Sequence, residues 1–222
     1  MAQAALRPAV RGPTFVRLLA RLAEVDVAAP SQALPDRLGQ WLDWNHALSL
    51  AAALDNHPAA PEGTAPAADD LIAECARARD TLLAAIGNEP LLAADAQAAG
   101  APDFAPYRHA CLTRQRAMQA TAGRLRGRLR DALMAASPEL ARLAEVDAVM
   151  EVALTPREHT LLARVSDLLG QRFARLHAAA QSHWLATFRR DMHSVLLAEL
   201  DLRFQPVDAL LAALRTHQES TC

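Results

Sequence analysis

Arginine shows the clearest chemical pattern in this sequence of 222 residues. The stretch Gly123–Leu133 reads GRLRGRLRDAL, and residues 104–130 contain seven arginines without a single Asp or Glu. Guanidinium groups bind phosphates and carboxylates through paired hydrogen bonds, so this segment suits either nucleic acid or acidic protein groups. Six of these residues form our candidate interaction surface, called the arginine surface below: Arg114, Arg116, Arg124, Arg126, Arg128 and Arg130.

Helical spacing places the arginine surface around an apolar stripe. With about 100° between successive residues, one stripe is formed by Met118, Ala122, Leu125, Leu129 and Leu133. One side of the stripe then holds Arg116, Arg126 and Arg130, and the other side holds Arg114, Arg124 and Arg128. The arginines therefore flank a packing seam, where their aliphatic stems can cover its edges.

The charges before and after this helix favour pairing with carboxylates. Residues 69–103 contain seven acids and two arginines, and residues 131–156 contain five acids and one arginine. We therefore predict that the arginines pair with acids of the same chain or of a partner subunit. The alternative is that the arginine-rich helix 108–130 binds nucleic acid through its phosphates.

No other residue type is spaced for catalysis or metal binding. The eight histidines include no pair three or four residues apart, and HExxH, GxSxG, GxGxxG and P-loop motifs are missing. Cys75, Cys111 and Cys222 form no CxxC pair, which is typical of free thiols in a reducing compartment. We predict no catalytic residue, no metal site and no cofactor, and therefore a protein that is not an enzyme.

The composition predicts helices as the elements that position these residues. Hydrophobic residues make up 52% of the chain, mostly as Ala and Leu, and there are only 8 glycines. Ala and Leu favour helix, and the β-branched residues that favour strands are few. The predicted fold is all-α: an extended helical bundle built on two long helices, with a smaller N-terminal helical cap.

Breaks in the helical pattern divide the chain into five parts. Residues 1–12 are predicted to be disordered, residues 13–56 to form the N-terminal helical cap, and residues 57–68, with three prolines, to form a linker. Residues 69–215 form the predicted long-helix bundle and residues 216–222 a tail. The predicted core residues are Leu38 and Trp41 in the cap, and Phe173, Trp184 and Phe188 in the bundle.

Two long helices dominate the predicted bundle. The first runs from about Phe104 to Ala136, and a separate helix then runs from Ser137 to about Leu154. Thr155-Pro156-Arg157-Glu158 combines a capping box with a proline at the first position, which predicts that the second long helix begins there. It is expected to continue to Pro206 as a curved bundle helix, because its apolar stripe follows no strict heptad of the coiled-coil kind.

Apolar runs in this sequence are too short for a membrane span. None approaches the ~18–20 uncharged residues needed to cross a bilayer, and the N-terminus has no signal-peptide h-region. We expect a cytoplasmic protein without membrane insertion.

Two segments resemble a known bacterial family. They are the N-terminal GPTFVRLLARLAEVDV with RLGQWLDWNHALSLAAAL, and the C-terminal LLAELDLRFQPVDALLAALR. The family is described only as a domain of unknown function, and its members are often encoded near proton-channel proteins of the MotA/TolQ/ExbB type and near OmpA-like proteins. The resemblance implies no catalytic residues and a cytoplasmic accessory to an envelope complex.

These observations predict a non-enzymatic helical interaction or scaffold protein. Its partner is expected to be another protein or a second copy of the chain, in a homo-oligomer. The alternative is a nucleic-acid-binding helical protein that uses helix 108–130.

Overall fold

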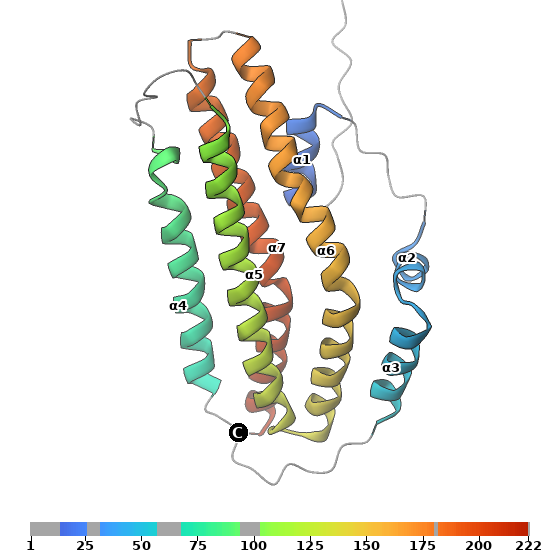
Figure 1. Cartoon of the computed structure of the whole chain (residues 1–222). Coiled ribbons are helices and arrows are strands. Elements are labelled where there is room, and N and C mark those ends of the chain that lie inside the picture. The colour runs from blue at the N-terminus through green and yellow to red at the C-terminus, as the bar shows by residue number, and fades with distance from the viewer. Residues whose placement is uncertain (1–13, 26–31, 57–67, 94–102, 180–181, 222) are drawn as a thin grey trace, which may run out of the picture.

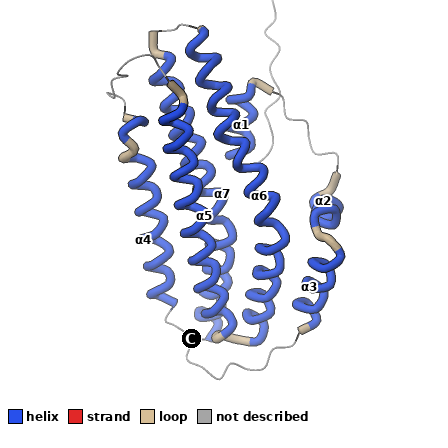
Figure 2. The backbone as a smooth tube through the Cα atoms, in the orientation of Figure 1, coloured by secondary structure: helices blue, strands red, loops and turns tan. Residues whose placement is uncertain are grey.

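The computed structural model describes residues 14–25, 32–56, 68–93, 103–179 and 182–221. These residues form α1 (Thr14–Ala23), α2 (Leu34–Trp41), α3 (Trp44–Asp55), α4 (Ala68–Gly87), the short 3-10 helix η1 (Pro90–Leu92), α5 (Ala105–Met134), α6 (Pro138–Ala178) and α7 (Trp184–Thr221). No strand occurs in the described ranges (Figure 2), which confirms the all-α prediction. The predicted disordered residues 1–12, nearly all of the linker 57–68, and Cys222 lie outside the described residues.

Four helices, α4 to α7, run side by side along the length of the molecule (Figure 1). α4 contacts α5 and α7, and α6 contacts both α5 and α7. α1 lies against α6 and α7, and α3 lies against α6 on the outside of the bundle. With 41 residues in α6 and 38 in α7, each of these two helices is about 60 Å long.

The apolar stripe of α5 is the centre of the bundle core. Met118, Leu129 and Leu133 are completely buried, and Ala122 and Leu125 are nearly so. At the end of the bundle where α5 begins, five aromatic rings form a cluster: Phe104, Tyr107, Phe173, Trp184 and Phe188. Phe173 and Phe188 are buried, as predicted, and Trp184 is half-buried against them.

Gly170 lets an aromatic ring of this cluster approach α6 closely. A Cβ atom added at Gly170 would lie only 3.0 Å from Cε1 of Phe104. The ring of Phe104 is fixed in turn by Phe173, with 5.6 Å between the centroids, and by Phe188, with 6.1 Å. A side chain at position 170 would therefore require the Phe104 ring to shift by a few tenths of an ångström.

The prediction that a helix begins at Thr155 is wrong, because α6 passes through this position without a break. The Thr155 hydroxyl donates back to the carbonyl of Glu151, 2.6 Å away, and does not cap a new helix. A proline inside a helix costs about 3 kcal/mol, but α6 is held on both sides of Pro156, by α3 before it and by α1 after it. The α6 ribbon changes direction partway along its length (Figure 1), as expected for a helix that contains a proline.

The end of the second long helix is also corrected. α6 ends at Ala178, and α7 begins at Trp184 and continues through Pro206 to Thr221. The chain therefore reverses within the apolar stripe that the sequence presents as one face of one helix. Packing across the reversal explains this, since the Trp184 ring lies edge-on to Phe173, with 5.1 Å between centroids.

Leu38 and Trp41 lie outside the core in which we predicted them. Both are half-buried on α2, a helix of 8 residues, and neither belongs to the cluster of core residues. α2 is too short to bury a full face against the bundle. The division into a cap and a long-helix bundle remains a prediction.

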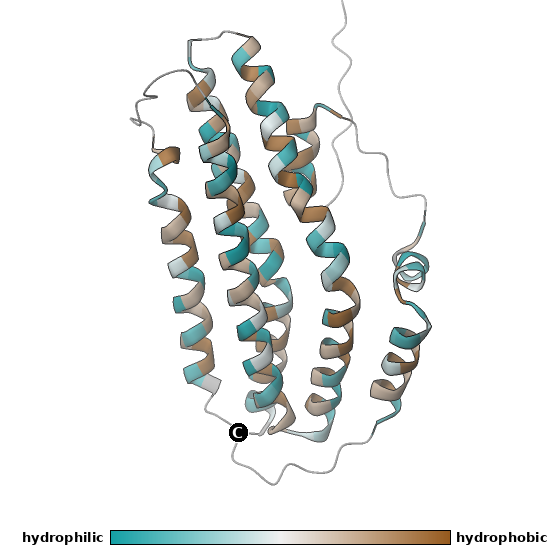
Figure 3. Cartoon of the chain, in the orientation of Figure 1, coloured by the Kyte–Doolittle hydropathy of each residue, from teal (hydrophilic) through white to brown (hydrophobic). Residues whose placement is uncertain are grey.

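Every helix carries hydrophilic as well as hydrophobic residues along its length (Figure 3). Among the described residues, none of the helices combines the length and the apolar character that a bilayer crossing requires.

Candidate functional site

On the α4 side of α5, one glutamate binds two residues of the arginine surface. Arg124 lies 2.5 Å from Glu74, and Arg128 contacts the other oxygen of the same carboxylate. The hydrogen bond from Arg124, supported by Arg128, lowers the pKa of Glu74 below its ordinary value. Further along the same side, Arg114 pairs with Glu89 at 2.9 Å.

On the α6 side, two arginines and two acids form a network. Arg126 lies 2.6 Å from Asp147, and Arg130 lies 2.9 Å from Asp147 and 2.6 Å from Glu151. Arg126 and Glu151 close the network at 3.3 Å. These side chains are mostly buried, so water and salt screen the network only weakly.

The predicted pairing of arginines with acids of the same chain is therefore confirmed for five of the six residues. The acids come from both sides of α5, in the two acidic stretches on either side of residues 104–130. Arg116 differs, because it is exposed and no ion pair with a described carboxylate joins it. Arg116 lines a cavity instead.

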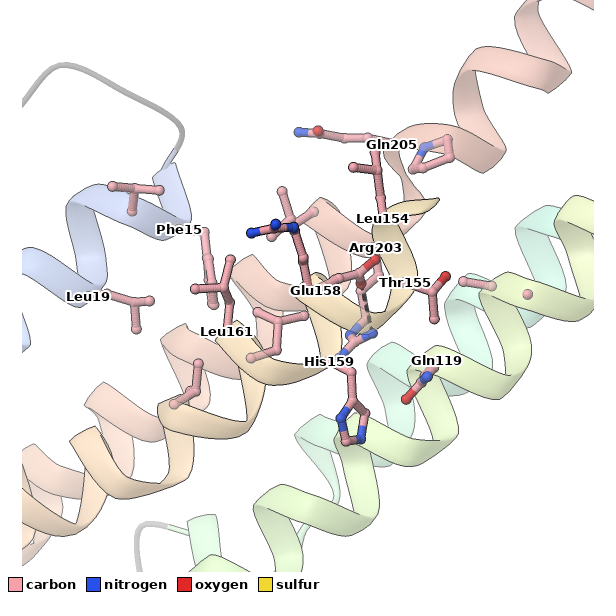
Figure 4. A pocket seen from close by; sticks show the side chains of 18 of the residues that line it. Phe15, Leu19, Gln119, Leu154, Thr155, Glu158, His159, Leu161, Arg203 and Gln205 are labelled. Carbon is pink, nitrogen blue, oxygen red and sulfur yellow. Dashed lines mark hydrogen bonds and ion pairs between the residues drawn. The ribbon is translucent and has the colours of Figure 1, made fainter. Parts of the chain in front are cut away.

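This cavity, of about 1220 Å³, lies between α1, α5, α6 and α7 and is called the α6 cavity below. Phe15 and Leu19 of α1 face Leu161 of α6 across it, and Gln119 and His159 lie on its α5 side (Figure 4). Trp41 of α2 also lines it, with the guanidinium of Arg157 5.7 Å from the ring centroid. The half-burial of Trp41 is thus explained by its place at the edge of this cavity.

Two prolines lie at the level of the α6 cavity. Pro206 of α7 lines it directly, and Thr155 and Arg157, the neighbours of Pro156, line it from α6. Neither proline can donate the backbone hydrogen bond that would tie its turn to the preceding one. The cavity lies where each of two continuous helices lacks one backbone hydrogen bond.

A buried ionic network forms one wall of the α6 cavity. Arg203 donates to Glu199 at 2.9 Å and to Glu158 at 3.0 Å, and both Arg203 and Glu158 line the cavity (Figure 4). Glu199 is completely buried. The Gln115 amide bridges Glu199, at 2.8 Å, and the carbonyl of Leu162, at 3.2 Å.

Burial raises the pKa of Glu199 above its ordinary value, although Gln115 and Arg203 stabilise its charged form. Burial also raises the pKa of the Cys111 thiol to about 12, with a smaller contribution from the charge of Glu199. A thiol with this pKa is not a nucleophile at neutral pH.

A second cavity of about 400 Å³ adjoins the first and shares Leu19, Leu161, Val165 and Leu168 with it. Arg164 lines this second cavity. Together the two cavities form a groove along α6 beside α1, called the α6 groove below. Its walls are mainly aliphatic, so it suits an apolar surface.

Among the residues that the structure describes, no three His, Cys, Asp or Glu side chains are close enough together to hold a metal ion. The chemistry that the groove offers is burial of apolar area beside charged rims. Such a surface binds through the hydrophobic effect, and charges at its edge select the orientation.

Sequence reasoning missed the α6 groove, although one segment contained a signal. Within LLAELDLRFQPV, Glu199 and Arg203 are one helical turn apart in an otherwise apolar stripe, and Pro206 follows. A buried ion pair next to a helix-breaking residue is unusual in a plain core. That combination could have identified this part of α7 as a candidate functional site.

The chain matches a protein-family model over nearly its whole length. The model of a family described as protein of unknown function (DUF3348) matches residues 1–216. No curated protein and no solved structure matches the chain.

Proposed function

We propose that this chain, which belongs to the DUF3348 family, is a non-enzymatic interaction protein that binds another protein in the α6 groove. The observation that supports the proposal is the open apolar space of about 1220 Å³ between four of its helices. Monomeric proteins seldom leave a large contiguous apolar surface open to water, and such a surface is typical of a protein-binding site. An exposed leucine at its edge, Leu161 with 59% of its surface accessible, points to a surface meant to be covered.

The arginine surface supports a different role, in the folding of the chain itself. Five of its six guanidinium groups already bind carboxylates from α4, α6 and the segment between α4 and η1. A phosphate would have to displace those acids before binding. We therefore favour protein binding over the alternative, nucleic-acid binding by helix 108–130.

The biological setting that we propose follows from the resemblance of the chain to its family. A cytoplasmic accessory to an envelope complex of the proton-channel type would need a protein-binding surface and no catalytic centre. The partner in this proposal is another protein, with self-association into a homo-oligomer as the second form that the interaction takes.

The test is crosslinking at Leu161 in cells that express the chain naturally. A photo-reactive amino acid at position 161 should capture a specific protein, and the same amino acid at Leu83 should not. Leu83 is an exposed leucine on α4 that lines neither cavity. Capture at both positions alike, or at neither, would contradict the proposed binding role of the groove.

A second measurement separates the two candidate functions. The purified chain is titrated with a generic duplex and a single strand over a salt series, beside the variant Arg124→Gln/Arg126→Gln/Arg128→Gln/Arg130→Gln. We expect no nucleic-acid binding at physiological salt and a less stable variant, because Glu74, Asp147 and Glu151 lose the arginines that pair with them. Micromolar binding that disappears in a folded variant would support the alternative.

A further inference from the structure

α1 forms one wall of the α6 groove and shows how a helix packs on this face of α6. α1 is an amphipathic helix of 10 residues whose Phe15 and Leu22 belong to the buried core. It lies against α6 and α7. Side chains at this spacing are the anchors by which a helix binds in an apolar groove.

An acidic residue fastens α1 to α6. Glu24, directly after the helix, lies 3.2 Å from Arg172 and 3.9 Å from Arg175. Arg175 also donates to the carbonyl of Leu22. α6 thus binds a carboxylate beside an apolar helix at the end of α1.

Arg175 is one of three arginines on the same face of α6. Arg157, Arg164 and Arg175 are separated by 7 and 11 residues, spacings that return to nearly the same direction on a helix. Arg157 and Arg164 are exposed at the rims of the two cavities, about 10 Å apart along the axis. Neither forms an ion pair with a carboxylate among the described residues.

The acids near these two arginines are already bound elsewhere. Glu158 pairs with Arg203 at 3.0 Å, and Asp167 pairs with Arg108 at 3.6 Å. Among the described residues, the charges at the rim of the groove that lack an ion pair are therefore positive. Carboxylates at the edge of an incoming surface would complement it.

The size of the space fits a helix as well. A helix with its side chains is about 10 Å across, so two to three turns occupy on the order of 1200 Å³. The α6 cavity has about 1220 Å³. A segment of the size of α1 would fill it.

From these observations we infer that the α6 groove binds an acidic amphipathic helix of a protein partner. Its apolar face covers Leu19, Leu161 and Leu168, and two of its carboxylates, two helical turns apart, pair with Arg157 and Arg164. This inference rests on the proposed function and names the class of partner.

The test uses two synthetic helical peptides of about 18 residues, long enough to hold a helix. They share the same leucines at helical spacing, and one has glutamates at the flanking positions where the other has lysines. Binding of each fluorescent peptide to the full chain is measured by anisotropy. We expect the glutamate peptide to bind about tenfold more tightly, and the difference to shrink at high salt.

Charge reversal of the rim provides the decisive variant. In Arg157→Glu/Arg164→Glu the preference should invert in favour of the lysine peptide. The control Arg77→Glu/Arg215→Glu changes net charge equally at exposed arginines that line neither cavity and should leave the preference unchanged. Leu161→Glu should weaken both peptides, and since Leu161 is exposed, this variant should fold normally.

Several outcomes would overturn the inference. Equal binding of both peptides, or a preference for the glutamate peptide that persists in Arg157→Glu/Arg164→Glu, would show that Arg157 and Arg164 do not select the charge of the bound helix. Binding of phosphatidylglycerol vesicles that is lost in Leu161→Glu would identify a lipid as the occupant. If the Leu161 crosslink captures a protein through a basic segment, the inference fails and the proposed function stands; if it captures no protein, both fail.

Discussion

Glu199 and Arg203 lie one turn apart on α7, and water reaches almost none of either side chain. Removing two charges from water costs several kcal/mol for each ion, and their attraction repays this only when the geometry is good. Here the guanidinium of Arg203 donates to both Glu199 and Glu158, and the Gln115 amide donates to the second carboxylate oxygen of Glu199. The pair is therefore tolerated as a unit, and loss of one member should be costly.

Arg203→Met tests this dependence. At neutral pH the variant should lose about 3–5 kcal/mol of stability, because Glu199 remains buried without its cation. Burial already raises the pKa of Glu199 from its ordinary value of 4.5, so ionisation of this group lowers stability as the pH rises through the folded-state pKa. Denaturant melts should therefore show a deficit that is small below pH 4.5 and grows above it.

A second substitution checks the cause of that deficit. Glu199→Gln added to Arg203→Met removes the uncompensated charge and should restore part of the stability. A deficit that is the same at low and high pH would mean that lost packing of the arginine stem explains the effect.

Glu74→Gln tests the pairing on the other side of α5. The pKa of Glu74 is lowered in the folded protein, so its contribution is present above its ordinary value of 4.5 and is lost as the pH falls through the folded-state pKa. We expect a loss of about 1 kcal/mol at neutral pH, the upper range for a surface pair. Asp80→Asn, an exposed acid on the same helix, should change stability little at any pH, and equal effects of the two substitutions would contradict the pairing.

At the scale of elements, two glycines in helices should respond oppositely to alanine. Gly123→Ala should stabilise the protein by up to about 1 kcal/mol, because a Cβ there meets no atom within 4 Å and alanine favours helix. Gly170→Ala gains the same propensity but places its Cβ 3.0 Å from the Phe104 ring. We expect a lower Tm for Gly170→Ala than for Gly123→Ala, measured by circular dichroism, and a gain for both would show that Phe104 moves freely.

The helices show which features of an element can be predicted from sequence. The stripe of α5 follows from its period alone, because every residue of it is buried at helical spacing. The capping box at Thr155 failed as a predictor, since packing of α6 on both sides outweighs the local preference of four residues. The reversal between Ala178 and Trp184 has no glycine or proline to mark it and depends on contacts between Phe173 and Trp184.

At the scale of the whole molecule, Cys111 reports on cooperative unfolding. Its side chain is completely buried at the centre of the bundle, and its thiol pKa is about 12. At about pH 8, where free thiols react readily, iodoacetamide should leave Cys111 unmodified until the bundle opens. Peptide mapping over a urea series should place its modification on the same transition as the circular dichroism signal, and earlier modification would reveal local opening of α5.

The candidate site shows where sequence reasoning stops at this scale. Pairing of Arg124 and Arg126 with acids on either side could be predicted, because charge balance along the chain is a property of the residues. The α6 groove could not be predicted, because an unfilled space arises from the relative positions of α1, α6 and α7. Glu199 and Arg203, which lie close to Pro206 in the sequence, were the local indication of where the groove lies.

The position of α1 as a wall of the α6 groove has a consequence for selectivity. Because α1 belongs to the same chain, a free helix that reached Arg172 and Arg175 would compete with a segment whose local concentration is on the order of millimolar. A helix bound beside Arg157 and Arg164 would therefore leave α1 in place and would not reach Arg172 and Arg175. α1 would in this way limit which arginines of α6 the acidic residues of the bound segment can reach.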